Sequence, residues 1–219
     1  MNLIPGALKI AFRSFERRKF FTFVSLFGIT FTLLVLLVAA AFVDHSVGPH
    51  SPESRAGRTL YVERTRMAGE HSIRNSDAGY GFLDKEVRGL PGAENVSVFT
   101  MPESAVSYLD GRKIKSRLKR VDGAFWAILD MHFLEGAAFT ADDDRQSRPV
   151  AVINSTTRDR FFGGSKALGQ TIEVAAQRLR VVGVVEDVSS MRFMICADVY
   201  APIGTIPGEA WRHEAQGNF

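Results

Sequence analysis

The stretch from Phe20 to Val43 constrains the fold of this chain more than any other, because it contains no charged residue and no His, Asn, Gln or Pro. A helix of this length spans roughly 36 Å at about 1.5 Å per residue, which exceeds the hydrocarbon core of a bilayer at about 30 Å. Each Leu, Ile, Phe or Val near the centre favours insertion by roughly 0.3 to 0.6 kcal/mol. Residues 20–43 are therefore predicted to form a transmembrane helix.

Charged residues on the two flanks predict the orientation of this helix. Asp44, His45 and Glu53 follow the span, whereas five basic residues precede it, opposed there only by Glu16: Lys9, Arg13, Arg17, Arg18 and Lys19. Because basic residues near a span stay on the cytoplasmic side, the N-terminus is expected inside and the chain after about residue 44 outside. The same five residues are expected to rest on anionic lipid headgroups, at about 1 kcal/mol per residue.

A cleaved signal peptide is the alternative to a retained anchor. The run Ala39-Ala40-Ala41 loosely fits the small-residue cleavage rule, and a basic region precedes the apolar segment. The apolar run is longer than the usual 7–15 residues of a signal sequence, however. The sequence therefore favours an anchor, and a mature protein that starts near Phe42 would contradict it.

Composition limits what the rest of the chain can be. The 219 residues carry a formal net charge of +3, much of it from the basic leader, so no nucleic-acid partner is predicted. About one or two domains are expected at this length, and roughly 170 residues outside the membrane suffice for a core. The single Cys196 excludes an intrachain disulfide and is expected to act as a small hydrophobe.

Two helical patterns occur in this part of the chain, one in the leader before the span and one within the span itself. In the leader, residues 1–19, Leu8, Phe12 and Phe15 share one side, which predicts either an amphipathic helix in the membrane interface or an inward continuation of the span. Within residues 20–43, small and hydroxyl side chains form a stripe made of Thr22, Ser25, Gly28 and Thr32. Such a stripe lets other helices approach closely, although membrane helices also tolerate Ser and Thr without a partner.

The remainder reads as a linker, an extracytoplasmic α+β domain and a tail. Residues 44–57 are expected to be a linker, 58–202 the domain, with possible lobes at 58–120 and 121–202, and 203–219 an unstructured tail. Strands are predicted at 59–63, 95–100, 105–109, 112–121, 149–153, 171–174, 178–185 and 198–201, helices within 82–87, 123–131 and 155–162, and a loop at 67–79. Asp110-Gly111 gives the clearest hairpin signal.

One strand of that hairpin carries a basic face. Lys113, Lys115, Arg117 and Lys119 recur at period two, so they are expected on one side of the strand. Such a face suits an anionic ligand or a lipid headgroup. A solvated strand face that discourages edge pairing is the simpler interpretation.

Catalytic motifs are missing from the sequence. It contains no G-x-x-x-x-G-K-[ST], since Gly163-Gly164-Ser165-Lys166 follows a predicted helix instead of preceding one, and no G-x-S-x-G or H-E-x-x-H. The five His residues are widely spread, and Asp142-Asp143-Asp144 lacks the alternating spacing of a calcium loop. No catalytic residue, cofactor or metal site is predicted, and the chain is not expected to be an enzyme.

Several segments together carry a family resemblance. They are Ala11-Phe12-Arg13-Ser14-Phe15, Phe133-Leu134-Glu135-Gly136-Ala137-Ala138-Phe139, Pro149-Val150-Ala151-Val152-Ile153, Arg160-Phe161-Phe162-Gly163-Gly164, Leu168-Gly169-Gln170-Thr171-Ile172 and Val181-Val182-Gly183-Val184-Val185-Glu186-Asp187-Val188. In this order, behind a basic leader and one span, they resemble the N-terminal part of the MacB-like ABC transporter permeases, a group that includes the LolC, LolE and FtsX proteins.

The resemblance implies a permease subunit of the bacterial inner membrane whose outer part is a periplasmic core domain. Its implied partners are an ABC ATPase subunit in the cytoplasm, a second permease subunit and the lipid membrane. It also implies three further spans, so the sequence is expected to be a truncated permease, a deliberately shortened chain or one piece of a split subunit. Two alternatives remain open: a single-pass anchored sensor or binding domain, and a secreted enzyme after cleavage.

Overall fold

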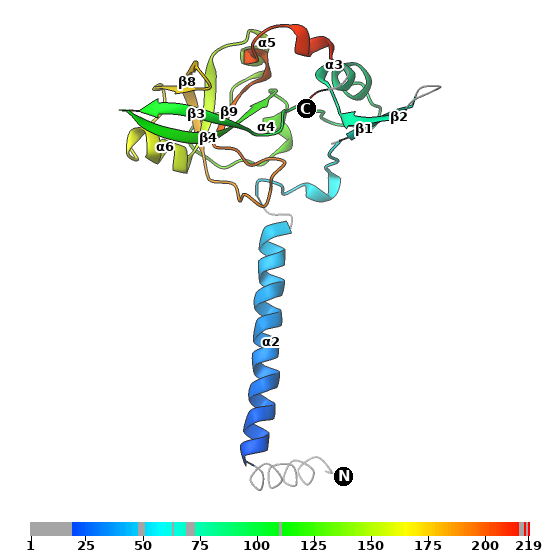
Figure 1. Cartoon of the computed structure of the whole chain (residues 1–219), viewed down its shortest axis with the longest axis vertical. Helices are drawn as coiled ribbons and strands as arrows, with labels where there is room; N and C mark the ends of the chain where they lie inside the picture. The colour runs from blue at the N-terminus through cyan, green and yellow to red at the C-terminus, as the bar shows by residue number, and fades with distance from the viewer. Residues whose placement is uncertain are drawn as a thin grey trace. The chain divides into compact units, whose positions relative to one another are not determined.

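The computed structural model describes residues 19–47, 51–62, 64–68, 73–109, 111–214, 217 and 219. The chain divides into two compact units, Met1–Gly48 and Pro49–Phe219 (Figure 1). The predicted leader helix lies outside the described residues, and so do Lys9, Arg13, Arg17 and Arg18.

The first unit contains the helix α2, Lys19–Val47. Residues Lys19–Asp44 are long and apolar enough to cross a membrane, with a mean hydropathy of 2.7 and no burial within the chain. The rings of Phe23, Phe27 and Phe31 stack along one side at centroid distances of 6.3 and 6.0 Å. The helix continues past the predicted end at Val43, so the first residues of the expected linker are helical instead.

The second unit begins with a segment that packs onto its own domain. Pro52 is buried and its carbonyl accepts a hydrogen bond from the Asp130 amide at 2.8 Å, and the 3-10 helix η1 spans Ala56–Arg58. The prediction of a free linker through residue 57 is therefore wrong. The prediction of a strand at 59–63 is also wrong for the described residues 59–62, because no neighbouring strand pairs with their backbone.

A small antiparallel hairpin follows, made of β1 (Arg64–Ala68) and β2 (Ile73–Asp77) and paired from Arg64↔Asp77 to Ala68↔Ile73. The sequence prediction of a loop from residue 67 is wrong here. Residues 64–66 and 75–77 are all polar, so apolar and polar residues do not alternate there and the pattern gave no strand signal. The helical turns α3 (Tyr80–Phe82) and η2 (Leu83–Val87) come next and confirm the predicted helix.

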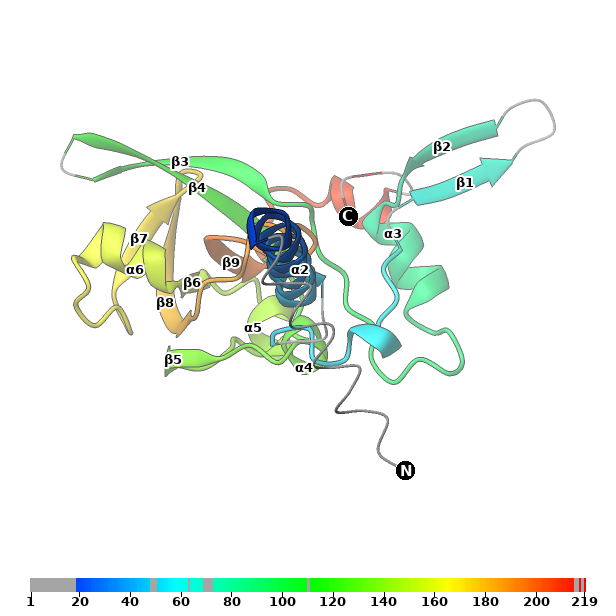
Figure 2. The same cartoon turned by 90° about the horizontal axis from the view of Figure 1, so that it is seen from below.

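Seven strands form the main sheet, in the order β3-β4-β9-β6-β8-β5, with β7 also paired to β8. Their bounds are β3 Glu103–Leu109, β4 Arg112–Val121, β5 Phe133–Gly136, β6 Val150–Asn154, β7 Thr171–Val174, β8 Gln177–Val185 and β9 Val199–Pro202. The pairs β4–β9 and β6–β8 are parallel and the others antiparallel. Figure 2 shows the β3–β4 and β1–β2 hairpins projecting from opposite sides of this unit.

Turn and cap residues explain why several predicted elements are confirmed. The β3–β4 hairpin pairs Leu109 with Arg112, and Gly111 has the positive φ of +75° that its turn needs. Asn154 caps α6 (Ser155–Phe162) by accepting from the Thr157 amide at 2.8 Å. Gly163 ends that helix in the left-handed region. The predicted strand at 95–100, in contrast, is reduced to one bridge between Phe99 and Val121.

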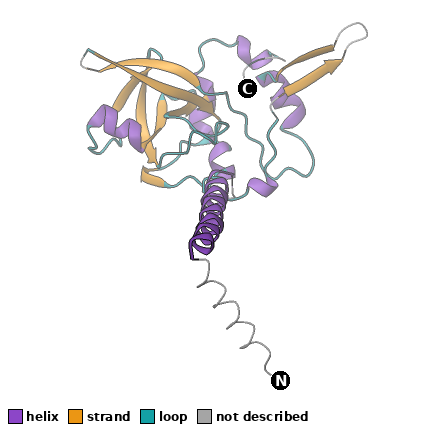
Figure 3. Ribbon diagram, turned by 60° about the horizontal axis from the view of Figure 1, so that its bottom comes forward, coloured by secondary structure: helices purple, strands orange, loops and turns teal. Residues whose placement is uncertain are grey.

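Two hydrophobic cores lie against this sheet. The aliphatic core includes Leu118, Ile153, Ile172, Leu179 and Val199, and Phe161 and Phe162 of α6 pack onto it. The aromatic core includes Phe125, Phe139 and Tyr200, with Trp126 packed against it. Three short helices complete the sheet domain (Figure 3): α4 Phe125–Ile128, α5 Ala141–Arg145 and α6.

Residues 203–214 are folded, contrary to the expected unstructured tail at 203–219. It contains η3 (Ile203–Thr205) and η4 (Ala210–His213). Trp211 is 7% exposed and lies edge-on to Tyr80 at 4.8 Å. Ile203 and Trp211 belong to a third, smaller core with Ala78, Leu83 and Val98.

The predicted lobe boundary at 120/121 is not a boundary in the structure. Strand β4 runs through it from Arg112 to Val121 and lies inside the seven-stranded sheet. A smaller group of elements lies elsewhere, where α3, η2, η3 and η4 contribute side chains to the third core.

Candidate functional site

The helix α2 carries the predicted stripe on its surface. Ser25, Gly28 and Thr32 are exposed and Thr22 is partly exposed, and the Thr32 hydroxyl donates to the Gly28 carbonyl at 2.8 Å. A Cβ added at Gly28 would meet no atom within 4 Å. The backbone is therefore open to a neighbouring surface at this point. Lys19, the one described residue of the basic cluster, is exposed at the start of the helix. The packing and membrane-surface roles of these residues stay predictions.

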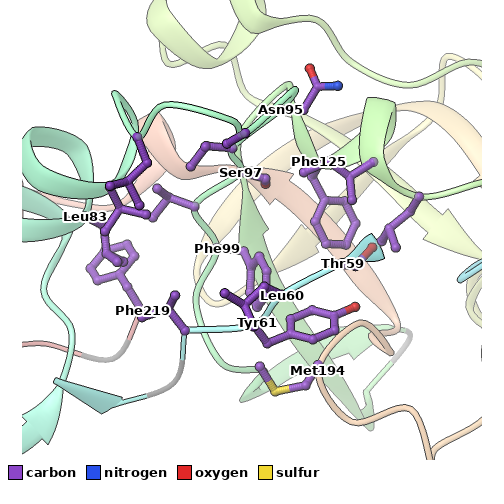
Figure 4. Close-up of a pocket in the computed structure, with 18 of the residues that line it drawn as sticks. Thr59, Leu60, Tyr61, Leu83, Asn95, Ser97, Phe99, Phe125, Met194 and Phe219 are labelled. Atoms are coloured by element: carbon purple, nitrogen blue, oxygen red, sulfur yellow. The ribbon is translucent and has the colours of Figure 1, made fainter. Parts of the chain in front are cut away.

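The domain holds a pocket of about 740 Å³. Figure 4 shows Leu83 and Phe219 on one side, Phe125 on the other, and Phe99 between them. The segment 59–62 forms one wall, and residues 90–99 form another. A volume of this size falls within the range of about 300 to 1,000 Å³ typical of small-molecule sites.

Aromatic rings make the inner surface of the pocket. Phe99 lies edge-on to Tyr61 at 6.3 Å and to Phe125 at 5.8 Å. Leu129 and Ile195, both buried, add to the same apolar lining. Edge-to-face contacts of this kind hold rings in fixed positions, so the lining is preorganised by the aromatic core beneath it.

Asp122 fixes the wall made by residues 95–99. Its carboxylate is 6% exposed and accepts hydrogen bonds from the Ser97 hydroxyl at 2.7 Å, the Val98 amide at 3.0 Å and the Phe125 amide at 3.1 Å. Arg88 lies 3.3 Å from the same carboxylate. One side chain on the sheet therefore positions both the wall and the start of α4.

A second polar cluster holds the segment 59–62 in place. The Tyr61 hydroxyl donates to Glu53 at 2.5 Å, and the Glu53 carboxylate pairs with Arg192 at 2.5 Å. Burial raises the pKa of Tyr61, and the hydrogen bond to Glu53 raises it further. Tyr61 therefore stays a neutral donor, and its ring faces the pocket while its hydroxyl is tied to the domain.

Three guanidinium groups and two carboxylates line the pocket: Arg55, Arg58, Arg64, Asp77 and Glu94. Arg58 pairs with Glu94 at 2.8 Å, and both side chains are more than 70% exposed. Arg64 stands opposite Asp77 in the β1–β2 register. Arg55 is exposed and has no carboxylate partner among the residues that the structure describes. Among the lining residues that the structure describes, the net charge is therefore positive.

The basic strand face divides into an exposed half and a buried half. Lys113 and Lys115 are exposed, as a solvated face requires, and Arg117 pairs with Asp198 at 3.2 Å. Lys119, in contrast, is fully buried, donates to the Thr100 carbonyl at 2.8 Å and sits 4.1 Å above the Phe99 ring. Burial lowers the pKa of Lys119 to about 7. The expectation of a uniformly solvated face is wrong at Lys119.

No cluster of three or more His, Cys, Asp or Glu residues suited to a metal occurs in the described part of the chain. The acidic run 142–144 belongs to the first turn of α5, where Thr140 and Asp143 form a capping box. Asp144 is tied to the Gly204 amide at 2.8 Å. These carboxylates therefore stabilise the start of α5 and bind the segment at Gly204.

Sequence reasoning did not find the pocket. Its walls come from segments that lie far apart in the chain, such as residues 59–62, 90–99 and Met194. The one available signal was the apolar group Leu60-Tyr61-Val62, which the strand prediction absorbed. Leu60 is in fact 88% exposed and lines the pocket.

Comparison with known proteins adds family membership to this geometry. The profile of the MacB-like periplasmic core domain matches residues 22–217, which include most of α2 and nearly the whole second unit. One relative is the macrolide export ATP-binding/permease protein MacB of Wolinella succinogenes, 23% identical over 185 residues. Another is the ABC transporter permease YknZ of Bacillus subtilis, 19% identical over 207 residues.

These relatives are longer than the chain. The match covers 83% of this chain and 28% of the Wolinella protein, and 92% of this chain and 52% of YknZ. The chain thus spans between about a quarter and a half of the relatives that it matches.

Two solved structures align with part of the chain. The extracellular domain of YknZ aligns with 52% of this chain and 57% of its own, at 17% identity and a TM-score of 0.45. The periplasmic region of MacB from Actinobacillus actinomycetemcomitans aligns with 58% of this chain and 63% of its own, at 20% identity and a TM-score of 0.43. By the match over residues 22–217, the chain belongs to the MacB-like periplasmic core domain family.

Proposed function

We propose that this chain is the N-terminal portion of the permease subunit of an ABC transporter. In this role, ATP hydrolysis by a partner in the cytoplasm is coupled to export or release of a substrate outside the membrane. The observation that supports the proposal is the match over residues 22–217, which runs without interruption from the apolar helix into the folded domain. The relatives are ABC transporter permeases, which supports a permease-type role.

The proposed partners follow from the same arrangement. ATP hydrolysis is proposed to come from an ABC ATPase subunit, in keeping with relatives that are named as ABC transporter permeases and ATP-binding/permease proteins. The stripe of Thr22, Ser25, Gly28 and Thr32 is the proposed contact with other membrane helices, including those of a second permease subunit. The N-terminus is proposed to face the cytoplasm across the inner membrane, with the basic leader on the lipid surface.

Co-purification from native membranes tests this proposal. Tagged chain, extracted in a mild detergent, should retain an ABC ATPase subunit and an untagged permease copy. Gly28→Leu should reduce the recovered permease several-fold, because it fills the exposed backbone notch in the stripe. Thr30→Leu adds apolar bulk at a similar depth on another side of α2 and should leave recovery unchanged.

Two outcomes would contradict the proposal. Recovery of a sensor kinase with no ATPase would favour a single-pass anchored sensor or binding domain. Equal recovery of the permease copy from the Gly28→Leu and Thr30→Leu chains would remove the stripe as the contact between helices.

A further inference from the structure

We infer that the pocket beside Phe99 binds an anionic amphiphile, a molecule with an apolar chain or ring system and one carboxylate, sulfate or phosphate group. The inference concerns the outer domain alone, and it does not depend on the proposed coupling to ATP hydrolysis. Three features of the pocket support it: its lining, its exposed apolar rim and the charge at its rim.

The lining suits an apolar body. Phe99, Phe125, Leu129 and Ile195 present rings and aliphatic groups to a volume of about 740 Å³. Asp122 holds the wall that carries Val98, and the Glu53–Arg192 pair holds Tyr61 through its hydroxyl. Because both walls are tied to the sheet domain by buried polar contacts, the pocket is formed before a ligand arrives, which lowers the entropic cost of binding.

The apolar surface continues outward over the rim. Leu60 is 88% exposed, Leu90 52%, Met101 42% and Val62 41%, and all four line the pocket. Scattered apolar residues on a surface are ordinary, but a group of them around a concave apolar site marks a place where further apolar area is covered. A chain longer than the pocket, lying partly across this rim, would cover these side chains.

The charges at the rim favour a ligand that carries a negative charge. Arg55, Arg58 and Arg64 outnumber Asp77 and Glu94. Glu94 is engaged by Arg58 at 2.8 Å, and Arg55 has no carboxylate partner among the described residues. A guanidinium group has five donors, so Arg58 can hold Glu94 and still donate to an anion. A cationic amphiphile would instead meet Arg55 and Arg64, with Glu94 already paired to Arg58 and Asp77 opposite Arg64 in the β1–β2 register.

Photo-crosslinking in the full chain tests the inference. The chain is placed in nanodiscs of zwitterionic phosphatidylcholine and irradiated with decanoic acid that carries a diazirine near its methyl end. Modified peptides are then mapped by mass spectrometry. Saturable adducts are expected within residues 90–101 and 123–131. Excess unlabelled decanoate or decyl sulfate should reduce them at least five-fold, and decyltrimethylammonium should not.

Matched variants separate the pocket from general apolar adsorption. Leu60→Asp places a carboxylate at the exposed rim and should reduce pocket adducts at least five-fold. Tyr108→Asp changes a 71% exposed ring on β3 outside the pocket and should have no effect. Arg55→Glu should weaken competition by decanoate and introduce competition by decyltrimethylammonium, whereas Arg112→Glu on β4 should change neither.

The results that would overturn the inference are equally specific. They are adducts that do not saturate, adducts distributed over exposed apolar residues without preference for the pocket, and equal labelling of the Leu60→Asp and Tyr108→Asp chains. Competition by the cationic amphiphile as strong as that by decanoate would overturn the assigned charge.

Discussion

The Arg192 guanidinium lies 2.5 Å from the Glu53 carboxylate, and the two side chains are only 7% and 15% exposed. The pair joins the first segment of the outer domain to the loop that precedes β9, 139 residues away. Tyr61 donates to the other Glu53 oxygen at 2.5 Å. One carboxylate therefore anchors the segment that enters the domain and also positions a wall of the pocket.

Breaking the pair between Glu53 and Arg192 should destabilise the outer domain. Arg192→Met leaves the Glu53 carboxylate in a poorly solvated site, so we expect the free energy of unfolding to fall by about 3–5 kcal/mol. The exposed pair between Arg178 and Glu173, at 3.6 Å, provides the control, and Arg178→Met should cost less than about 1 kcal/mol. Urea unfolding followed by tryptophan fluorescence measures both. Equal costs would show that the Glu53–Arg192 pair is not buried.

From the burial of Lys119 we predict an unusual pH dependence of the free energy of unfolding. Its pKa is lowered to about 7 by burial, whereas the unfolded chain keeps a value near 10.4. Between about pH 7 and pH 10 the unfolded state therefore holds a proton that the folded state lacks. The free energy of unfolding should rise with pH over this window, by up to about 1.4 kcal/mol per pH unit.

Replacing Lys119 tests the sign of this effect. Lys119→Met should remove the slope and make the protein more stable at pH 6, by about 1–4 kcal/mol, because below pH 7 the cost of the buried charge is present in full. Lys113→Met, at an exposed position of the same strand, should keep the slope. If Lys119→Met were less stable than the parent at pH 6, the ammonium group would be stabilising the fold.

Two glycines with positive φ should differ in their tolerance of a side chain. A Cβ at Gly136 would lie 2.1 Å from the Val182 carbonyl oxygen, whereas a Cβ at Gly111 would meet nothing within 4 Å. Gly111→Ala should therefore lower the free energy of unfolding by about 1–2 kcal/mol, because the alanine must adopt a left-handed backbone conformation. Gly136→Ala should lower it clearly more, since the strands β5 and β8 must also separate. Thermal unfolding measures the difference, and equal shifts of the melting temperature would contradict the close approach.

Trp211 tests whether the end of the chain belongs to the fold. Trp211→Ala should lower the free energy of unfolding by about 3–5 kcal/mol, because the ring is 7% exposed and lies against Tyr80. Tyr108→Ala, at a 71% exposed ring, should change it by less than about 0.5 kcal/mol. A Trp211→Ala effect as small as that of Tyr108→Ala would restore an unstructured tail.

Local chemistry explains which elements were predictable from the sequence. The apolar helix, the turn at Gly111 and the helix within 155–162 each depend on neighbouring residues, and each was predicted. Residues 64–66 and 75–77 of the β1–β2 hairpin are all polar, so they left no alternation of apolar and polar residues. Trp211 gains its structural role from Tyr80, far away in sequence, and no local pattern indicates such a contact.

The pocket was unpredictable for the same reason. Tyr61, Phe99 and Met194 lie far apart in the sequence and meet only in the folded domain. Lys119 was misplaced because the period-two pattern predicts which face a residue occupies, but gives no indication that the aromatic core covers the far end of that face.

Accessibility of single cysteines in intact cells tests the central claim most directly, namely that α2 spans the membrane and holds the outer domain outside. The native Cys196 is buried, so an impermeant maleimide reports on introduced positions. We predict that Tyr108→Cys is modified in intact cells, that Asn2→Cys is modified only after permeabilisation, and that the protein stays with membranes in alkaline carbonate. Modification of Asn2→Cys but not of Tyr108→Cys in intact cells, or release by carbonate, would contradict the account.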